Sequence, residues 1–124
     1  MELTVCSKVC NECPFRGKSI PGWLGSHSLE DIKTAMDFEQ LFSCHMQRGE
    51  DIEENKAKTE SGEMNICRGF IAMSNKSCKM FGSNPYTGEE LRRLQLLVRE
   101  NPMTGDDDVM PHWDFEKHHS QFAK

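Results

Sequence analysis

Cysteine is the residue type with the clearest capacity for chemistry in this sequence of 124 residues, which contains six of them. Cys10 and Cys13 are separated by two residues, a spacing that lets two thiolates converge on one metal ion. Cys44 and Cys67 follow as single cysteines farther along the chain. Because four thiolates complete a tetrahedral shell, we predict that Cys10, Cys13, Cys44 and Cys67 bind one metal centre.

The identity of the metal stays open between zinc and a [4Fe-4S] cluster. Zinc is the usual occupant of small structural sites with four cysteine ligands, so it is our first expectation. One pair joined to two distant single cysteines also suits a cubane, whose four corners accept ligands from separate segments. Pro14, directly after Cys13, is a feature shared with ferredoxins. A cluster would indicate a redox or sensor role.

The two remaining cysteines are not predicted to be ligands. Cys78 follows Cys67 by eleven residues, which on one continuous helix separates them by about 16 Å. We interpret Cys78 as a half-buried packing residue and Cys6 as a spare thiol or packing residue. The spacing of Cys6, Cys10 and Cys13 matches radical S-adenosylmethionine enzymes, but this chain is too short to build their partial barrel.

Four histidines are candidates for further ligands or for hydrogen-bond donors to the metal site. His45 adjoins Cys44, and it is a candidate to replace one cysteine as a ligand, to donate a hydrogen bond to a ligand sulfur, or to lie at the surface. We predict the hydrogen bond, with Cys44 as the ligand. No metal is assigned to His112, His118 and His119, because their spacing does not fit a short helical pair of ligands.

Local signals predict three helices that position these side chains. Ser28 can cap a helix that extends to about residue 42, and a second helix is expected from about Asn65 to Cys78. The third begins at a predicted capping box of Thr87 and Glu90 and ends at Asn101.

The other segments lack such signals. Residues 1–27 are rich in glycine and proline and predict an irregular, cysteine-rich loop, with at most a short strand near residues 2–6. Residues 47–63 are almost wholly polar and predict a long exposed loop with at most a marginal helical turn. The predicted fold is mainly α, with about three helices around a site of four cysteines.

Length and composition favour one metal-binding domain, which we place at residues 1–105, followed by an acidic, histidine-containing tail at 106–124. The chain is 36% apolar and 28% charged, so its core is thin and a metal cross-link would help it fold. No signal peptide or membrane span is recognised, which predicts a cytoplasmic protein. In that reducing compartment, closely spaced cysteines favour metal binding over disulfides.

The sequence favours a binding module over an enzyme. Four cysteines leave no open position on a metal, and no catalytic motif is present. The net charge of −5 disfavours nucleic-acid binding through bulk electrostatics, so a protein partner is the stronger expectation. Arg16, Lys18 and Trp23 are the candidate contact residues, with Phe15 near them more suited to the core.

Three motifs resemble a set of uncharacterised small proteins from bacteria and their phages. These are Cys10 and Cys13 followed by Pro14, Phe15 and Arg16, then Cys44 with His45, then Cys67 with Gly69 and Phe70. The resemblance covers about residues 10–70. It implies a bacterial or phage source and a shared site on the four cysteines with His45 nearby, and it implies no activity.

Overall fold

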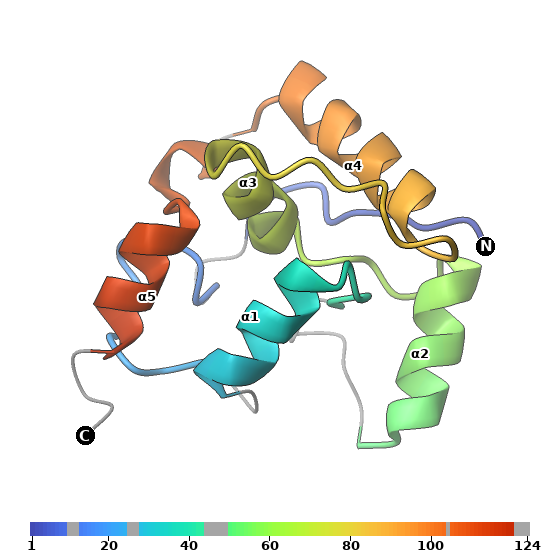
Figure 1. The fold of residues 1–124 in the computed structure, drawn as a ribbon, viewed down its shortest axis with the longest axis horizontal. Coiled ribbons are helices and arrows are strands. Elements are labelled where there is room, and N and C mark those ends of the chain that lie inside the picture. The colour runs from blue at the N-terminus through green and yellow to red at the C-terminus, as the bar shows by residue number, and fades with distance from the viewer. Residues whose placement is uncertain (10–12, 25–27, 44–49, 104, 121–124) are drawn as a thin grey trace.

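The computed structural model describes residues 1–9, 13–24, 28–43, 50–103 and 105–120. These residues form five α-helices and one 3₁₀ helix (Figure 1), which are α1 (Leu29–Asp37), α2 (Ile52–Ser61), α3 (Arg68–Lys76), α4 (Gly88–Glu100), η1 (Asp106–Asp108) and α5 (His112–Ser120). The described ranges contain no strand, only isolated bridges such as that between Val5 and Ile66. The mainly α prediction is confirmed, and the predicted count of three helices is too low.

Helix α1 begins as its sequence predicts and ends earlier. Ser28 and Asp31 form a reciprocal capping box, in which each side chain accepts a hydrogen bond from the backbone of the other residue. Ile32, Ala35 and Met36 are buried on one face. The helix ends at Asp37, and Glu39 has a positive φ of 56°, a conformation that does not continue a right-handed helix.

Helix α2 replaces most of the long loop predicted at residues 47–63. Asp51 caps it by accepting a hydrogen bond from the Glu54 amide, and Gly62 ends it in the left-handed conformation. Lys58 pairs with Glu54 one turn earlier at 2.9 Å. Thr59 is its one buried residue. The helix is therefore marked by its caps and one ion pair, which a search for apolar periodicity does not detect.

Helix α3 is the centre of the fold, since seven of its nine residues are buried. Helix α4 packs along it through Leu91, Leu94 and Val98. The capping box predicted at the start of α4 does not form, because Thr87 makes no side-chain capping bond. Its hydroxyl donates instead to the Glu39 carbonyl, and Glu90 accepts from the Leu3 amide at 3.0 Å.

The C-terminal segment packs against the rest of the chain. Asp106, Val109, Phe115 and His119 are all buried. Phe115 of α5 stacks on Phe15 with ring centroids 5.0 Å apart. The part of residues 106–124 that the structure describes therefore contributes to the same core as α3. None of the helices described is long and apolar enough to cross a membrane.

Candidate metal centre

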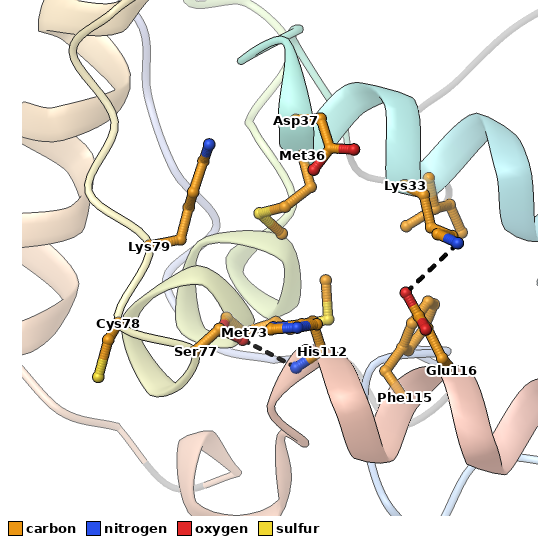
Figure 2. Close-up of a pocket in the computed structure, with 11 residues that line it drawn as sticks. Lys33, Met36, Asp37, Met73, Ser77, Cys78, Lys79, His112, Phe115 and Glu116 are labelled. Carbon is orange, nitrogen blue, oxygen red and sulfur yellow. Dashed lines mark hydrogen bonds and ion pairs between the residues drawn. The ribbon is translucent and has the colours of Figure 1, made fainter.

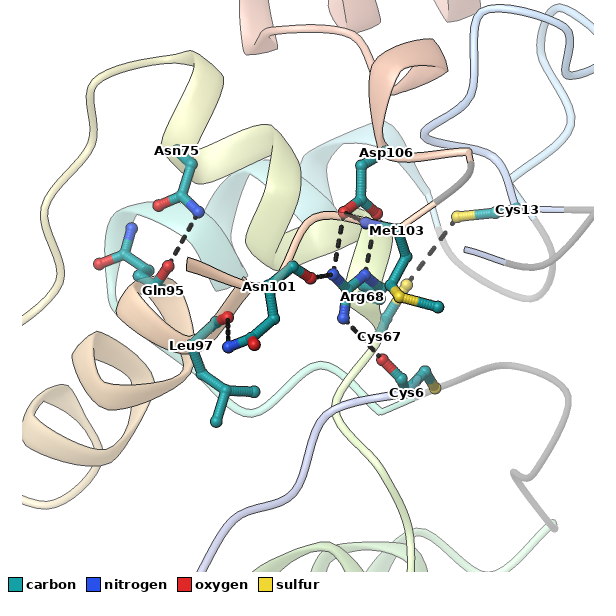
Figure 3. A network of polar contacts seen from close by, with 10 residues as sticks. All are labelled: Cys6, Cys13, Cys67, Arg68, Asn75, Gln95, Leu97, Asn101, Met103 and Asp106. Atoms are coloured by element: carbon teal, nitrogen blue, oxygen red, sulfur yellow. Dashed lines mark hydrogen bonds and ion pairs between the residues drawn. The ribbon is translucent and has the colours of Figure 1, made fainter. Parts of the chain in front are cut away.

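Two of the four predicted ligands lie together in the core. The Sγ atoms of Cys13 and Cys67 are 4.0 Å apart, although 54 residues separate them in the sequence. Their residues are 1% and 5% exposed. Figure 3 shows the two sulfurs facing each other beside the first turn of α3. The fold thus creates a buried pair of thiols from two distant segments.

Cys67 lies where three segments of the chain meet. It is the N-cap residue of α3, and its backbone amide donates to the Phe42 carbonyl at 2.8 Å. The preceding residue, Ile66, bridges Val5 in parallel and Ser43 in antiparallel orientation. These backbone contacts hold Cys67 beside the segments that lead to Cys10 and Cys44.

Gly69 allows the Cys13 sulfur to approach α3. A Cβ atom at this position would lie 2.5 Å from Cys13 Sγ and 3.0 Å from Phe15 Cβ, inside van der Waals contact. The close approach places the sulfur beside the N-terminal turn of the helix, where the partial positive charge of the helix dipole favours a thiolate. The Cys-x-Gly-aromatic motif therefore has a steric reason in this fold.

Cys10, Cys44 and His45 lie outside the described residues. Within the part that is described, no group of three or more His, Cys, Asp or Glu side chains is placed to hold a metal ion. That set contains only Cys13 and Cys67 of the four predicted ligands. The sequence neighbours of the other two are described: Val9 is 4% exposed, and Ser43 bridges Ile66.

A buried ion pair adjoins the cysteines and was not predicted from the sequence. Arg68, the residue after Cys67, is bidentate to Asp106, with N–O distances of 2.8 and 2.9 Å (Figure 3). The guanidinium also donates to the carbonyls of Cys6 and Asn101, at 3.3 and 2.8 Å. It thereby joins the N-terminal segment, α3, the end of α4 and η1.

The pKa of Asp106 reflects these contacts. Burial alone would raise it, but hydrogen bonds from Arg68 and from the Met103 amide outweigh burial and hold the pKa of Asp106 below its usual value. The carboxylate is therefore charged at neutral pH and balances the Arg68 charge. Because 38 residues separate the two side chains, no local pattern could have identified the pair.

The two other cysteines have different environments. Cys6 is half-buried, and its backbone amide donates to the Ile66 carbonyl at 3.1 Å. Cys78 is exposed, lies beyond the end of α3 and has a positive φ of 58°. The expectation that Cys78 is half-buried is therefore wrong. Cys67 and Cys78 lie at opposite ends of α3, in agreement with the exclusion of Cys78 from the site.

The candidate contact residues follow Cys13 in a loop of residues 16–24, here called the 16–24 loop. Arg16 pairs with Asp108 at 3.1 Å, and its side chain is 13% exposed. Lys18 is exposed and Trp23 is 37% exposed. Ile20, which the sequence analysis did not single out, is 71% exposed. Phe15 is fully buried and contacts Phe42, Phe70 and Phe115, as expected of a core aromatic.

Two histidines of α5 hold this loop. His119 is 2% exposed, its Nδ1 accepts from the Gly22 amide at 3.0 Å, and its Nε2 lies 2.7 Å from the Pro14 carbonyl. These partners require a neutral ring with the proton on Nε2. Burial lowers the pKa of His119, which also favours the neutral form. His118 Nε2 lies 2.8 Å from the Ser19 carbonyl.

Comparison with known proteins adds no relative. No family model matches the chain, and no match was found among the curated proteins or the solved structures.

Proposed function

We propose that this protein is a small zinc-binding interaction module in which Cys10, Cys13, Cys44 and Cys67 share one metal ion. The observation that carries the proposal is the buried pair of Cys13 and Cys67, whose sulfurs are 4.0 Å apart. Two thiolates on one tetrahedral ion, each about 2.3 Å from the metal, lie about 3.8 Å from each other. The observed separation suits two ligands of a shared ion.

The same distance favours zinc over the [4Fe-4S] alternative. In a cubane each thiolate binds a different iron, so an iron–iron edge adds to the separation of the ligand sulfurs. Cys13 and Cys67 are too close for two such corners without rearrangement. Zinc has no geometric preference beyond its tetrahedral shell, and it would close that shell with Cys10 and Cys44.

Chain connectivity supports the two ligands outside the described residues. Ser43 bridges Ile66, the residue before Cys67. Because consecutive Cα atoms are about 3.8 Å apart, the chain connection keeps Cys44 close to this bridge. Cys10 is three residues from Cys13 and directly follows buried Val9. In this proposal His45 donates a hydrogen bond to a ligand sulfur.

The proposed contact surface is the 16–24 loop, which begins three residues after Cys13. Lys18, Ile20 and Trp23 present a cation and two apolar side chains to solvent. Tryptophan is frequent among the residues that dominate binding energy at protein interfaces. We therefore propose a protein partner in the cytoplasm, where reduced thiols keep the metal, and no catalytic reaction.

Metal analysis tests the centre. Protein purified under reducing conditions should contain one zinc per chain by elemental analysis, with no visible absorption, since zinc has a filled d shell. Serine at Cys10, Cys13, Cys44 or Cys67 should each lower the zinc content, because a hydroxyl replaces a thiolate poorly. Cys78→Ser is the matched control and should retain one zinc. Iron and sulfide in coloured protein, or full zinc in Cys67→Ser, would contradict the proposal.

A chelator tests the link between metal and fold. Because metal-binding free energy is folding free energy in small sites, zinc removal should greatly lower the melting temperature. His45→Ala should keep one zinc but bind it about 10- to 100-fold more weakly in competitive chelator titrations. An unchanged melting curve in protein shown to be metal-free would refute a structural role for the metal.

Photocrosslinking tests the contact surface. A photoreactive residue at Ile20 should give one dominant crosslinked protein in cells, and the same group at Lys56 on exposed α2 is the control. Trp23→Ala should reduce this product while zinc content stays constant. Equal products from the two sites would refute the assignment of the 16–24 loop as the interface.

A further inference from the structure

A cavity of about 260 Å³ lies at the opposite end of α3 from the cysteines. It lies between α1, the end of α3 and α5, and Figure 2 shows α1 above it and α5 below it in that view. Ser77, which lines it, follows Cys67 by ten residues, about 15 Å along a helix. The cavity is therefore separate from the proposed zinc site.

The inner surface of the cavity is apolar and adaptable. Ile32, Met36, Met73 and Phe115 line it, and each is at most 6% exposed. Methionine side chains are flexible and polarisable, which suits them to bind apolar groups of different shape. A dry cavity of about 150 Å³ accommodates benzene, so the larger volume here suffices for a phenyl ring with a short polar substituent.

The rim of the cavity carries one cation and one anion that have no charged partner among the described residues. Lys33 and Glu116 pair with each other at 3.6 Å. In contrast, the Lys79 ammonium and the Asp37 carboxylate make no ion pair or side-chain hydrogen bond with any described residue, although both line the cavity. In Figure 2, Lys79 lies to the left of Met36 and Asp37 to its upper right.

We propose that this cavity binds a free amino acid with a large apolar side chain. The side chain would pack on Met36, Met73 and Phe115. The carboxylate would pair with Lys79 and the α-ammonium with Asp37, so the zwitterion satisfies both rim charges. A ligand with only one charge would leave either Lys79 or Asp37 without a partner, and a ligand without a large apolar group would leave the apolar floor uncovered.

The test is a titration of metal-loaded protein, followed by amide chemical shifts, with four small molecules. L-Phenylalanine has the ring and both charges, 3-phenylpropionate lacks the ammonium, phenethylamine lacks the carboxylate, and L-alanine lacks the ring. We expect saturable shifts at α1, the end of α3 and α5, with phenylalanine binding about five- to tenfold more tightly than either singly charged analogue. L-Alanine should give no saturable shift.

Charge-neutral variants separate the two contacts. Lys79→Gln should weaken phenylalanine and phenylpropionate about five- to tenfold and leave phenethylamine unchanged. Asp37→Asn should weaken phenylalanine and phenethylamine and leave phenylpropionate unchanged. Lys56→Gln, on exposed α2, is the control and should bind like the unmodified protein. No saturable shift with phenylalanine, equal affinity for phenylpropionate and phenylalanine, or shifts confined to the 16–24 loop would overturn the proposal.

Discussion

The two ends of α3 differ in their exposure to solvent. At the N-terminal end, here called the buried end, Cys67 contacts Cys13 in the core, and the buried Arg68–Asp106 ion pair lies beside them. At the C-terminal end, the helix stops beside an open cavity whose rim carries exposed charges. One short helix therefore has a buried pair of cysteines at one end and an accessible cavity at the other, because different segments pack against its two ends.

Among the changes considered, breaking the ion pair at the buried end of α3 should have the largest effect on the free energy of unfolding. Asp106→Ala leaves the Arg68 guanidinium buried without a counter-charge, which should cost about 3–5 kcal/mol of unfolding free energy. Denaturant titration of the purified, reduced protein measures this loss. Asp107→Ala, at the exposed neighbouring position, should change stability little. Equal effects of the two substitutions would show that the pair does not stabilise this end.

Filling the space beside the Cys13 sulfur should have the next largest effect. Gly69→Ala places a methyl group against Cys13 and Phe15, and such overpacking should cost about 1–3 kcal/mol of unfolding free energy. A double-mutant cycle with Cys13→Ala tests whether the clash with the Cys13 sulfur is the cause. Gly69→Ala should cost less unfolding free energy once that sulfur is absent. An unchanged cost in that background would place the strain elsewhere.

Acidification should lower the stability of the packing of α5, which contacts Pro14 near Cys13 and also lines the cavity. The pKa of His119 is lowered in the folded protein by burial, whereas an unfolded histidine titrates near its ordinary value of about 6.5. The unfolded chain therefore binds more protons below that pH, and the contribution of His119 to stability is lost as pH falls from about 6.5 toward the folded pKa. Melting temperatures between pH 7.5 and pH 5.5 measure this slope.

Replacing His119 tests its share of that slope. His119→Gln retains hydrogen-bonding groups but does not titrate, so the decline of melting temperature below about pH 6.5 should become shallower. His118→Gln, at the adjacent position, serves as the comparison. If both variants keep the full slope, other groups cause the acid sensitivity.

The smallest effect is expected at the open end. Lys33 and Glu116 are about 40% exposed, and exposed ion pairs contribute at most about 1 kcal/mol. Glu116→Gln should therefore lower the free energy of unfolding by less than that amount, as measured by denaturant titration at low salt. A loss as large as that of Asp106→Ala would remove the contrast between the two ends.

The sequence by itself determined the elements that depend on neighbours along the chain. The capping residue Ser28 and the apolar spacing after it located the start of α1, and regular apolar positions located α3 and α4. Excluding Cys78 from a site with Cys67 needed only helix geometry. The two described members of the predicted cysteine set lie together, whereas Cys10 and Cys44 stay predictions.

Only the tertiary structure decided which distant groups meet. Thr87 and Glu90 read locally as a capping box, but they bind Glu39 and Leu3. Arg68 pairs with Asp106. His119 makes hydrogen bonds with the backbone of Pro14 and Gly22. Ile32 and Phe115, from α1 and α5, line the same cavity. Helix α2 was missed for a different reason, because its two caps and the exposed Lys58–Glu54 ion pair support it without an apolar stripe. Local patterns report local free energies, whereas burial and buried charge pairing depend on the packing of the whole chain.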